Sequence, residues 1–96
     1  MSQPVLQRRT VALQRDRVLW RQLSDQVLVL DMWRLRYLRL NHSGSLLWHL
    51  LAEPRQPCEL VEVLLDTYDV SREEAADDVA AFLAELRVRG LLRDPA

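Results

Sequence analysis

The stretch at residues 35–51, "LRYLRLNHSGSLLWHLL", changes its hydrophobic period at Asn41. Up to Leu40 the apolar residues alternate with arginines, which is the pattern of a half-buried strand. After Asn41 they gather as "LLW" and "LL", which is the pattern of one side of a helix. The stretch therefore predicts a basic strand that passes through a turn of small residues into a short helix.

Two further strands are predicted upstream of this stretch. "RVLWRQL" (residues 17–23) and "QVLVL" (residues 26–30) are rich in Val and Leu, and Ser24-Asp25 between them suits a tight turn. Residues 11–13, "VAL", can form an additional short strand, and residues 31–34 connect to the strand at 35–40. Because a sheet of three short strands is marginally stable alone, helices must cover one of its faces.

The second half of the chain supplies three helices. Asn41 or Ser43 can cap the first, which runs to about Ala52, and Pro57 suits the first position of the second. The apolar positions of both helices recur at helical spacing. Those expected to point inward are Leu46, Leu47, Leu50 and Leu51, then Leu60, Val61, Leu64, Leu65 and Tyr68.

The third helix has a start and a stop signal. "SREE" is a capping box in which the side chains of Ser71 and Glu74 each bond to the other residue's backbone. Gly90 fits the left-handed position after the helix. The predicted fold is a compact α+β domain of winged-helix type, a three-stranded antiparallel sheet followed by three helices. The inward stripe of the third helix is Ala75, Val79, Phe82, Leu83 and Leu86.

The length and composition limit the class of protein. The chain has 96 residues, enough for one domain and no second core. Its apolar runs are far shorter than the roughly 20 residues of a membrane span, and its first ten residues lack an apolar signal core. Cys58 is the single cysteine, which excludes an intramolecular disulfide. We expect one domain over residues 1–96, cytoplasmic, monomeric or weakly dimeric, with residues 1–9 flexible.

The charges are unevenly distributed. Residues 1–45 contain eight arginines against three aspartates, whereas residues 46–96 contain five arginines against eleven carboxylates. A basic half and an acidic half suit a dipolar partner better than a uniformly charged polymer.

The side chains of an enzyme site are missing from the sequence. His42 and His49 are seven residues apart, without a metal-binding spacing, and Cys58 has no obvious activating partner. Asp77 and Asp78 are adjacent and point about 100° apart on a helix, which is unsuited to paired acid–base work. Only two glycines are present, so no glycine-rich phosphate loop exists. We expect a binding protein with no catalysis, no cofactor and no metal.

A DNA-binding regulator is one alternative, because strands and three helices can form a winged helix-turn-helix. A recognition helix in the major groove carries cations and amides on its outer face. The third helix instead presents Glu73, Glu74, Asp77, Asp78 and Glu85. This acidic face would repel phosphate, so we expect no nucleic-acid partner.

Three segments in order carry a family resemblance. "RYLRLNHSGSLLWHLL" is followed by "CELVEVLLDTYDVS" and then by "AADDVAAFLAELRVRGLL". Together they resemble the PqqD-like family, the recognition elements of ribosomally made, post-translationally modified peptides, over residues 27–92. "VLVLD", a short turn and "RYLRLN" are most similar to the stand-alone leader-binding proteins of lasso-peptide biosynthesis. Leu35 departs from these proteins, which often have a turn glycine there.

The resemblance implies a function and partners. It implies a non-catalytic protein that binds the leader of a precursor peptide. It would present that peptide to a separate leader peptidase, a transglutaminase-like cysteine protease, and to an ATP-dependent cyclase. A PqqD-type peptide chaperone for a radical-enzyme or other pathway is the alternative within the same fold.

An extended peptide can add itself as a strand to an exposed sheet edge, and the strand at residues 35–40 is the candidate edge. Arginines 34, 36 and 39 can equally serve to protect this edge from self-association. Tyr37 either meets the peptide or covers the sheet, and Leu38 and Leu40 are expected in the core.

The third helix would form the second wall of the site. We choose its flank of Asp78, Phe82 and Glu85 over the flank of Ala76, Ala80 and Arg87, since the first combines an aromatic floor with carboxylates. Elsewhere, Trp48 is expected in the core and Trp33 at an exposed loop tip that can touch a partner enzyme. The candidate peptide-binding residues are Leu35, Arg36, Tyr37, Leu38, Arg39, Asp78, Ala81, Phe82 and Glu85.

Overall fold

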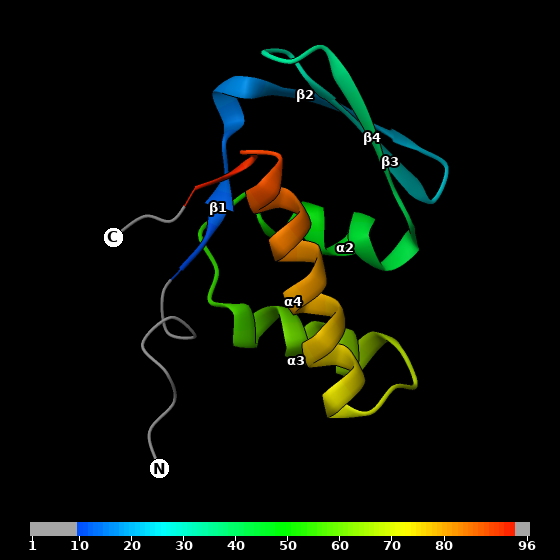
Figure 1. Cartoon of the computed structure of the whole chain (residues 1–96). Coiled ribbons are helices and arrows are strands. Elements are labelled where there is room, and N and C mark those ends of the chain that lie inside the picture. Colours follow the sequence, from blue (N-terminus) through cyan, green and yellow to red (C-terminus); the bar gives the residue numbers. More distant parts are fainter. Residues whose placement is uncertain (1–9, 94–96) are drawn as a thin grey trace.

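The structure, a computed structural model, describes residues 10–93, so the expected flexibility of residues 1–9 lies outside the described residues. Its order of elements confirms the predicted α+β class, a three-stranded sheet followed by three helices (Figure 1). The elements are β1 (Ala12–Leu13), the 3-10 helix η1 (Arg15–Arg17), β2 (Val18–Leu23), β3 (Gln26–Asp31), β4 (Arg36–Leu40), α2 (His42–Leu50), α3 (Pro57–Thr67), α4 (Arg72–Val88) and β5 (Leu92–Arg93).

The sheet has the order β2-β3-β4 and is antiparallel throughout, so β4 is an edge strand as predicted. The predicted turn at Ser24-Asp25 is confirmed, and Leu23 pairs with Gln26 across it. The second hairpin corrects one boundary. Leu35 has a φ of 54° and lies in the turn before β4. A residue in this left-handed conformation cannot continue an extended strand, so Leu35 does not share a face with Tyr37.

The short strand predicted at residues 11–13 exists, but it does not belong to this sheet. Ala12 pairs with Arg93, and Leu13 pairs with Leu92, so β1 forms a separate ladder with β5. The sequence reading missed β5, because two residues are too few to show a period. This ladder joins the two ends of the described chain (Figure 1).

The helix ends follow the predicted signals. Asn41, rather than Ser43, caps α2, and its Oδ1 accepts from the backbone N–H of Gly44 at 2.8 Å. Pro57 opens α3, and the capping box of Ser71 opens α4. Gly90 follows α4 with a φ of 73°. A β-carbon there would also lie 2.6 Å from Arg17 Nη1, so glycine is required on two counts.

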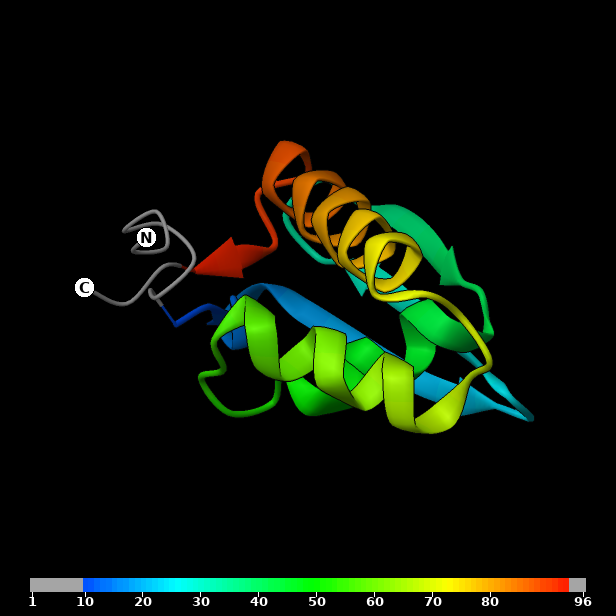
Figure 2. The same cartoon turned by 90° about the horizontal axis from the view of Figure 1, so that it is seen from below.

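The core lies between the inner face of the sheet and the helices, with Trp48 fully buried at its centre, as predicted. α2 contacts β3 and β4, whereas α4 packs mainly against α3, beside which it lies in Figure 2. The inward positions divide into two groups. Leu47, Leu51, Leu60, Leu64, Ala75, Val79, Leu83 and Leu86 are buried, while Leu46, Leu50, Val61, Leu65, Tyr68 and Phe82 are partly buried at the core margin.

Candidate functional site

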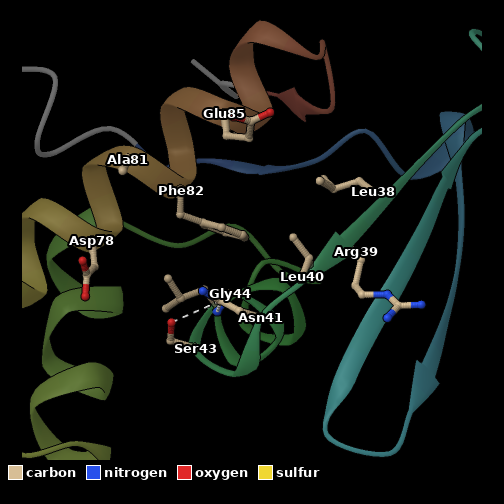
Figure 3. Close-up of a pocket in the computed structure, with 11 residues that line it drawn as sticks. Leu38, Arg39, Leu40, Asn41, Ser43, Gly44, Asp78, Ala81, Phe82 and Glu85 are labelled. Atoms are coloured by element: carbon tan, nitrogen blue, oxygen red, sulfur yellow. Dashed lines mark hydrogen bonds between the residues drawn. The ribbon is translucent and has the colours of Figure 1, made fainter.

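A cavity of about 420 Å³ opens between the edge strand β4 and helix α4. Figure 3 shows Phe82 reaching from α4 toward Leu38 and Leu40 of β4, with Gly44 at the start of α2 below them. We call this cavity the β4–α4 groove. It is lined by Leu38, Arg39, Leu40, Asn41, Ser43, Gly44, Leu47, Asp78, Ala81, Phe82 and Glu85.

The floor of the groove depends on a close approach at Gly44. A β-carbon on Gly44 would lie 2.9 Å from Asn41 Oδ1 and 3.6 Å from Phe82 Cε1. A side chain at this position would therefore displace the capping side chain of Asn41, although its β-carbon would make only an ordinary van der Waals contact with the phenyl ring. Next to it, the buried Ser45 hydroxyl accepts from the Val27 N–H at 2.8 Å and donates to the Leu40 carbonyl at 3.3 Å. These two bonds tie the start of α2 to the end of the sheet.

The direction of the backbone groups along β4 follows from the first hairpin. In a two-residue hairpin the residues flanking the turn exchange both hydrogen bonds, and bonded and non-bonded pairs then alternate. At the far end of this hairpin Met32 N donates to Arg17 O at 2.8 Å, which fits that alternation. Val27, Val29 and Asp31 therefore direct their backbone groups toward β4.

The same alternation fixes the phase on β4. The partners of Val27, Val29 and Asp31 are Leu40, Leu38 and Arg36. The backbone groups of these three β4 residues face β3, so those of Tyr37 and Arg39 face the free edge. Two residues thus offer unpaired backbone donors and acceptors beside the groove.

A buried ion pair links the second hairpin to the end of α4. Arg17 donates to Asp31 through Nε at 3.1 Å and Nη2 at 2.9 Å. Its guanidinium also donates to the carbonyls of Arg89 and Gly90, each at 3.1 Å. One guanidinium therefore holds the hairpin against the C-terminal end of α4, the two elements that form the walls of the groove.

Asp31 also shapes the turn between β3 and β4. Its Oδ1 accepts from the backbone N–H groups of Trp33 at 3.0 Å and Arg34 at 3.3 Å. The hydrogen bonds from Arg17, followed by those two backbone bonds, lower the pKa of the Asp31 carboxyl to about 2 against the opposing effect of burial. Trp33 is 72% exposed, as predicted for the loop tip, and its ring centroid lies 4.8 Å from the Arg17 guanidinium carbon.

The structure brings together six of the nine residues predicted for peptide binding. Leu38 and Arg39 line the groove from β4, and Asp78, Ala81, Phe82 and Glu85 line it from α4. The alternative flank of Ala76, Ala80 and Arg87 does not line it. The peptide-binding role of these residues stays a prediction.

Three predicted residues lie outside the groove lining. Leu35 is in the turn, Tyr37 projects from the outer face of the sheet, and Arg36 lines a small hollow nearer the hairpin. Leu38 also corrects the prediction for the core. It is half-buried rather than buried, because it borders the open groove, whereas Leu40 is buried as expected.

Sequence reasoning missed the lining that α2 contributes. Asn41, Ser43, Gly44 and Leu47 were assigned to the turn, the cap or the core. The available signal was the glycine in the first helical turn, where helix propensity disfavours it. Such a glycine points to a close approach, which here is that of Asn41 Oδ1.

Other candidate residues lie apart from the groove. His49 is exposed on α2, where it lies 2.6 Å from Gln22 Oε1, and Cys58 is exposed at the start of α3. Within residues 10–93, no three His, Cys, Asp or Glu side chains gather as metal ligands would. No helix in the same part of the chain is long and apolar enough to cross a membrane. The cytoplasmic location stays a prediction.

The fold and groove define a small α+β protein whose open strand edge faces a helix. Residues 26–92 match the family described as coenzyme PQQ synthesis protein D (PqqD). The chain therefore belongs to the PqqD family. The search of curated proteins gave no match.

Two solved structures share this fold. The first is described as TbiB1 in complex with the TbiA(beta) leader peptide; it is 30% identical, with a TM-score of 0.80, over 88% of this chain and 98% of that one. The second is described as lasso peptide synthetase B1 complexed with the leader peptide; it is 24% identical, with a TM-score of 0.76, over 86% of this chain and 96% of that one. The second likeness is one of fold.

Proposed function

We propose that this chain binds the leader region of a ribosomally made precursor peptide, which adds as a strand to the free edge of β4. The observation that carries this proposal is the β4–α4 groove, whose apolar floor includes Phe82 and which lies beside the free edge of β4, where the backbone groups of Tyr37 and Arg39 point outward. Strand addition supplies main-chain hydrogen bonds, while pockets read alternate side chains. TbiB1, which shares the fold, is described in complex with a leader peptide.

The chain itself would catalyse nothing and would present the bound precursor to other enzymes. We propose a leader peptidase, of the transglutaminase-like cysteine protease class, and an ATP-dependent cyclase as those partners. The similarity of the strands around the second hairpin to stand-alone lasso-peptide proteins supports a lasso precursor. A radical-enzyme pathway would use the same binding step, and genes beside this one for a peptidase and an asparagine-synthetase-like cyclase would favour the lasso pathway.

Binding to DNA is disfavoured by the charge of α4. Its exposed side chains include Glu73, Glu74, Asp77 and Asp78, and a helix so charged repels phosphate. A tight, sequence-specific complex in a gel shift at physiological salt would contradict this and favour a regulator.

The direct test is a titration of this chain into a fluorescein-labelled leader from the precursor peptide encoded beside its gene, with fluorescence anisotropy as the readout. A short peptide that becomes ordered on binding is expected to bind with a free energy of about −8 to −10 kcal/mol, which corresponds to a dissociation constant from submicromolar to micromolar. A scrambled leader of the same composition is the control. Absence of binding at high micromolar concentration would overturn the proposal.

A further inference from the structure

A positively charged hollow adjoins the first end of the groove, where β4 begins, and shares Leu38 with it. Arg34 and Arg36 line the small hollow between the hairpin and the C-terminal end of α4. Asp31 also lines this hollow, but Arg17 neutralises its carboxylate in the buried ion pair. Within residues 10–93, neither Arg34 nor Arg36 forms an ion pair with a carboxylate of its own.

The second end, where β4 passes into α2, is negatively charged. Asp78 lines both the groove and an adjoining hollow of about 270 Å³, whose walls include His42 and Tyr68. Asp78 is exposed and forms no ion pair within residues 10–93. Arg39 of β4 also lines the groove at this end, but Figure 3 shows its guanidinium pointing away from α4.

The middle of the groove is apolar, and the carboxylate that lines it is paired. Leu38, Leu40 and Phe82 line it together (Figure 3). Glu85 also lines the middle, but its carboxylate is paired with Arg89 one helical turn further on. The uncompensated charges are therefore confined to the two ends.

Resting on the proposed function, we propose that the groove selects and orients a leader segment with opposite charges at its ends. A carboxylate of the segment lies by Arg34 and Arg36, an apolar side chain lies on Phe82, and a cationic side chain lies by Asp78. A paired strand advances about 3.3 Å per residue alongside β4, so the two charged residues stand roughly four to six positions apart.

The charges also tie the direction of the bound peptide to the order of charges in its own sequence. An antiparallel partner of β4 has its N-terminus at the Leu40 end, so it reads cation, apolar residue and then carboxylate from its N-terminus, whereas a parallel partner would read the reverse order. The same segment bound in the opposite direction would place its carboxylate beside Asp78 and its cation beside Arg36. Like charges brought together across an interface suppress the wrong pairing.

The test uses charge reversals at the two ends of the groove, called the groove variants, each with a matched control on the same element type. Asp78→Lys is compared with Asp77→Lys, which lies next to it on α4 but does not line the groove. Arg36→Glu is compared with Arg21→Glu, which is exposed on β2, the opposite edge strand. The probe is the fluorescein-labelled leader of the precursor peptide encoded beside this gene, and circular dichroism melting confirms that each variant is folded.

Each groove variant is expected to weaken leader binding by about three- to thirtyfold at low salt, and each control by less than about twofold. Added salt should reduce the loss of leader affinity in the groove variants, because it screens the charges. A leader whose cationic residues are replaced by glutamate should bind Asp78→Lys more tightly than it binds the wild-type chain.

The two proposals fail in distinguishable ways. If the wild-type chain binds the leader but groove and control variants lose affinity equally, or if the glutamate-substituted leader gives no rescue, the charge inference is overturned and leader binding stands. If the wild-type chain does not bind the leader at all, the proposed function itself is overturned.

Discussion

Leu35 adopts a backbone conformation that residues with a β-carbon avoid. Its φ is 54°, in the left-handed region that favours glycine. The left-handed conformation costs an L-residue roughly 1–2 kcal/mol, and the side chain, 76% exposed, recovers little of this by burial. The turn before β4 therefore carries a conformational cost that is confined to Leu35.

Replacement of this residue by glycine should stabilise the domain. Leu35→Gly removes the energetic cost of the left-handed conformation. The greater freedom of glycine in the unfolded chain cancels about 0.5–1 kcal/mol of this gain in the free energy of unfolding. We expect the free energy of unfolding to rise by about 0.5–1 kcal/mol, measured by urea denaturation. Tyr37→Gly is the control, since Tyr37 is similarly exposed but lies in extended backbone, and this change should destabilise. A loss of stability in both variants would contradict the assignment of strain to Leu35.

At the scale of elements, the edge strand β4 has two kinds of backbone position. The groups of Arg36 and Leu38 face β3, and those of Tyr37 and Arg39 face outward. The sequence predicts that inward-facing and outward-facing positions alternate. Which residues face outward depends on the pair that closes the first hairpin, and this pair is known from the register of β2 and β3.

A proline scan should reveal this phase. Arg36→Pro and Leu38→Pro remove donors from the β3–β4 ladder and should lower the melting temperature. Tyr37→Pro and Arg39→Pro should leave the fold largely intact and weaken leader binding by about 1–3 kcal/mol, through a lost hydrogen bond and steric obstruction. Alanine at residues 37 and 39 keeps the N–H and should cost less affinity. Four folded proline variants that bind the leader like the wild type would rule out strand addition at β4.

The elements that could be predicted are those with local signals. Ser71 and Pro57 mark helix starts within one turn of sequence, and Ser24-Asp25 marks its hairpin, so these assignments needed no tertiary information. The groove lining was only partly predictable, because it assembles side chains from three elements. Gly44 and Phe82, 38 positions apart along the chain, line it together, and helical periodicity does not indicate that these two residues lie across a groove from each other.

At the scale of the whole molecule, Arg17 and Asp31 connect three distant parts of the chain. The N-terminal segment supplies the guanidinium, the second hairpin supplies the carboxylate, and the end of α4 supplies two carbonyl acceptors. Since the pKa of Asp31 lies near 2 in the folded chain and near 3.9 in an unfolded one, protonation favours the unfolded state.

The stabilisation from this carboxylate should depend on pH in a defined window. It is fully present above about pH 4 and is lost as the pH falls toward about 2. Asp31→Asn lacks it at every pH, so its melting temperature should lie several degrees below that of the wild type at neutral pH, with the gap narrowing in acid. Asp77→Asn, on an exposed face, is the control. A gap that stays constant from neutral pH to pH 2 would contradict the role of the ionised pair.

The ladder between β1 and β5 has a consequence for engineering. It holds residues 12–13 against residues 92–93, on the side of α4 away from β4 in both Figure 1 and Figure 2. A modifying enzyme fused genetically at either residue 10 or residue 93 would thus be attached on the same side of the domain, and it would not obstruct the groove. With a flexible linker, the fused enzyme would have an effective concentration in the millimolar range at the bound precursor, so the two would no longer have to meet by diffusion. The same neighbouring ends make the domain suitable for circular permutation, or for insertion into a surface loop of a host protein.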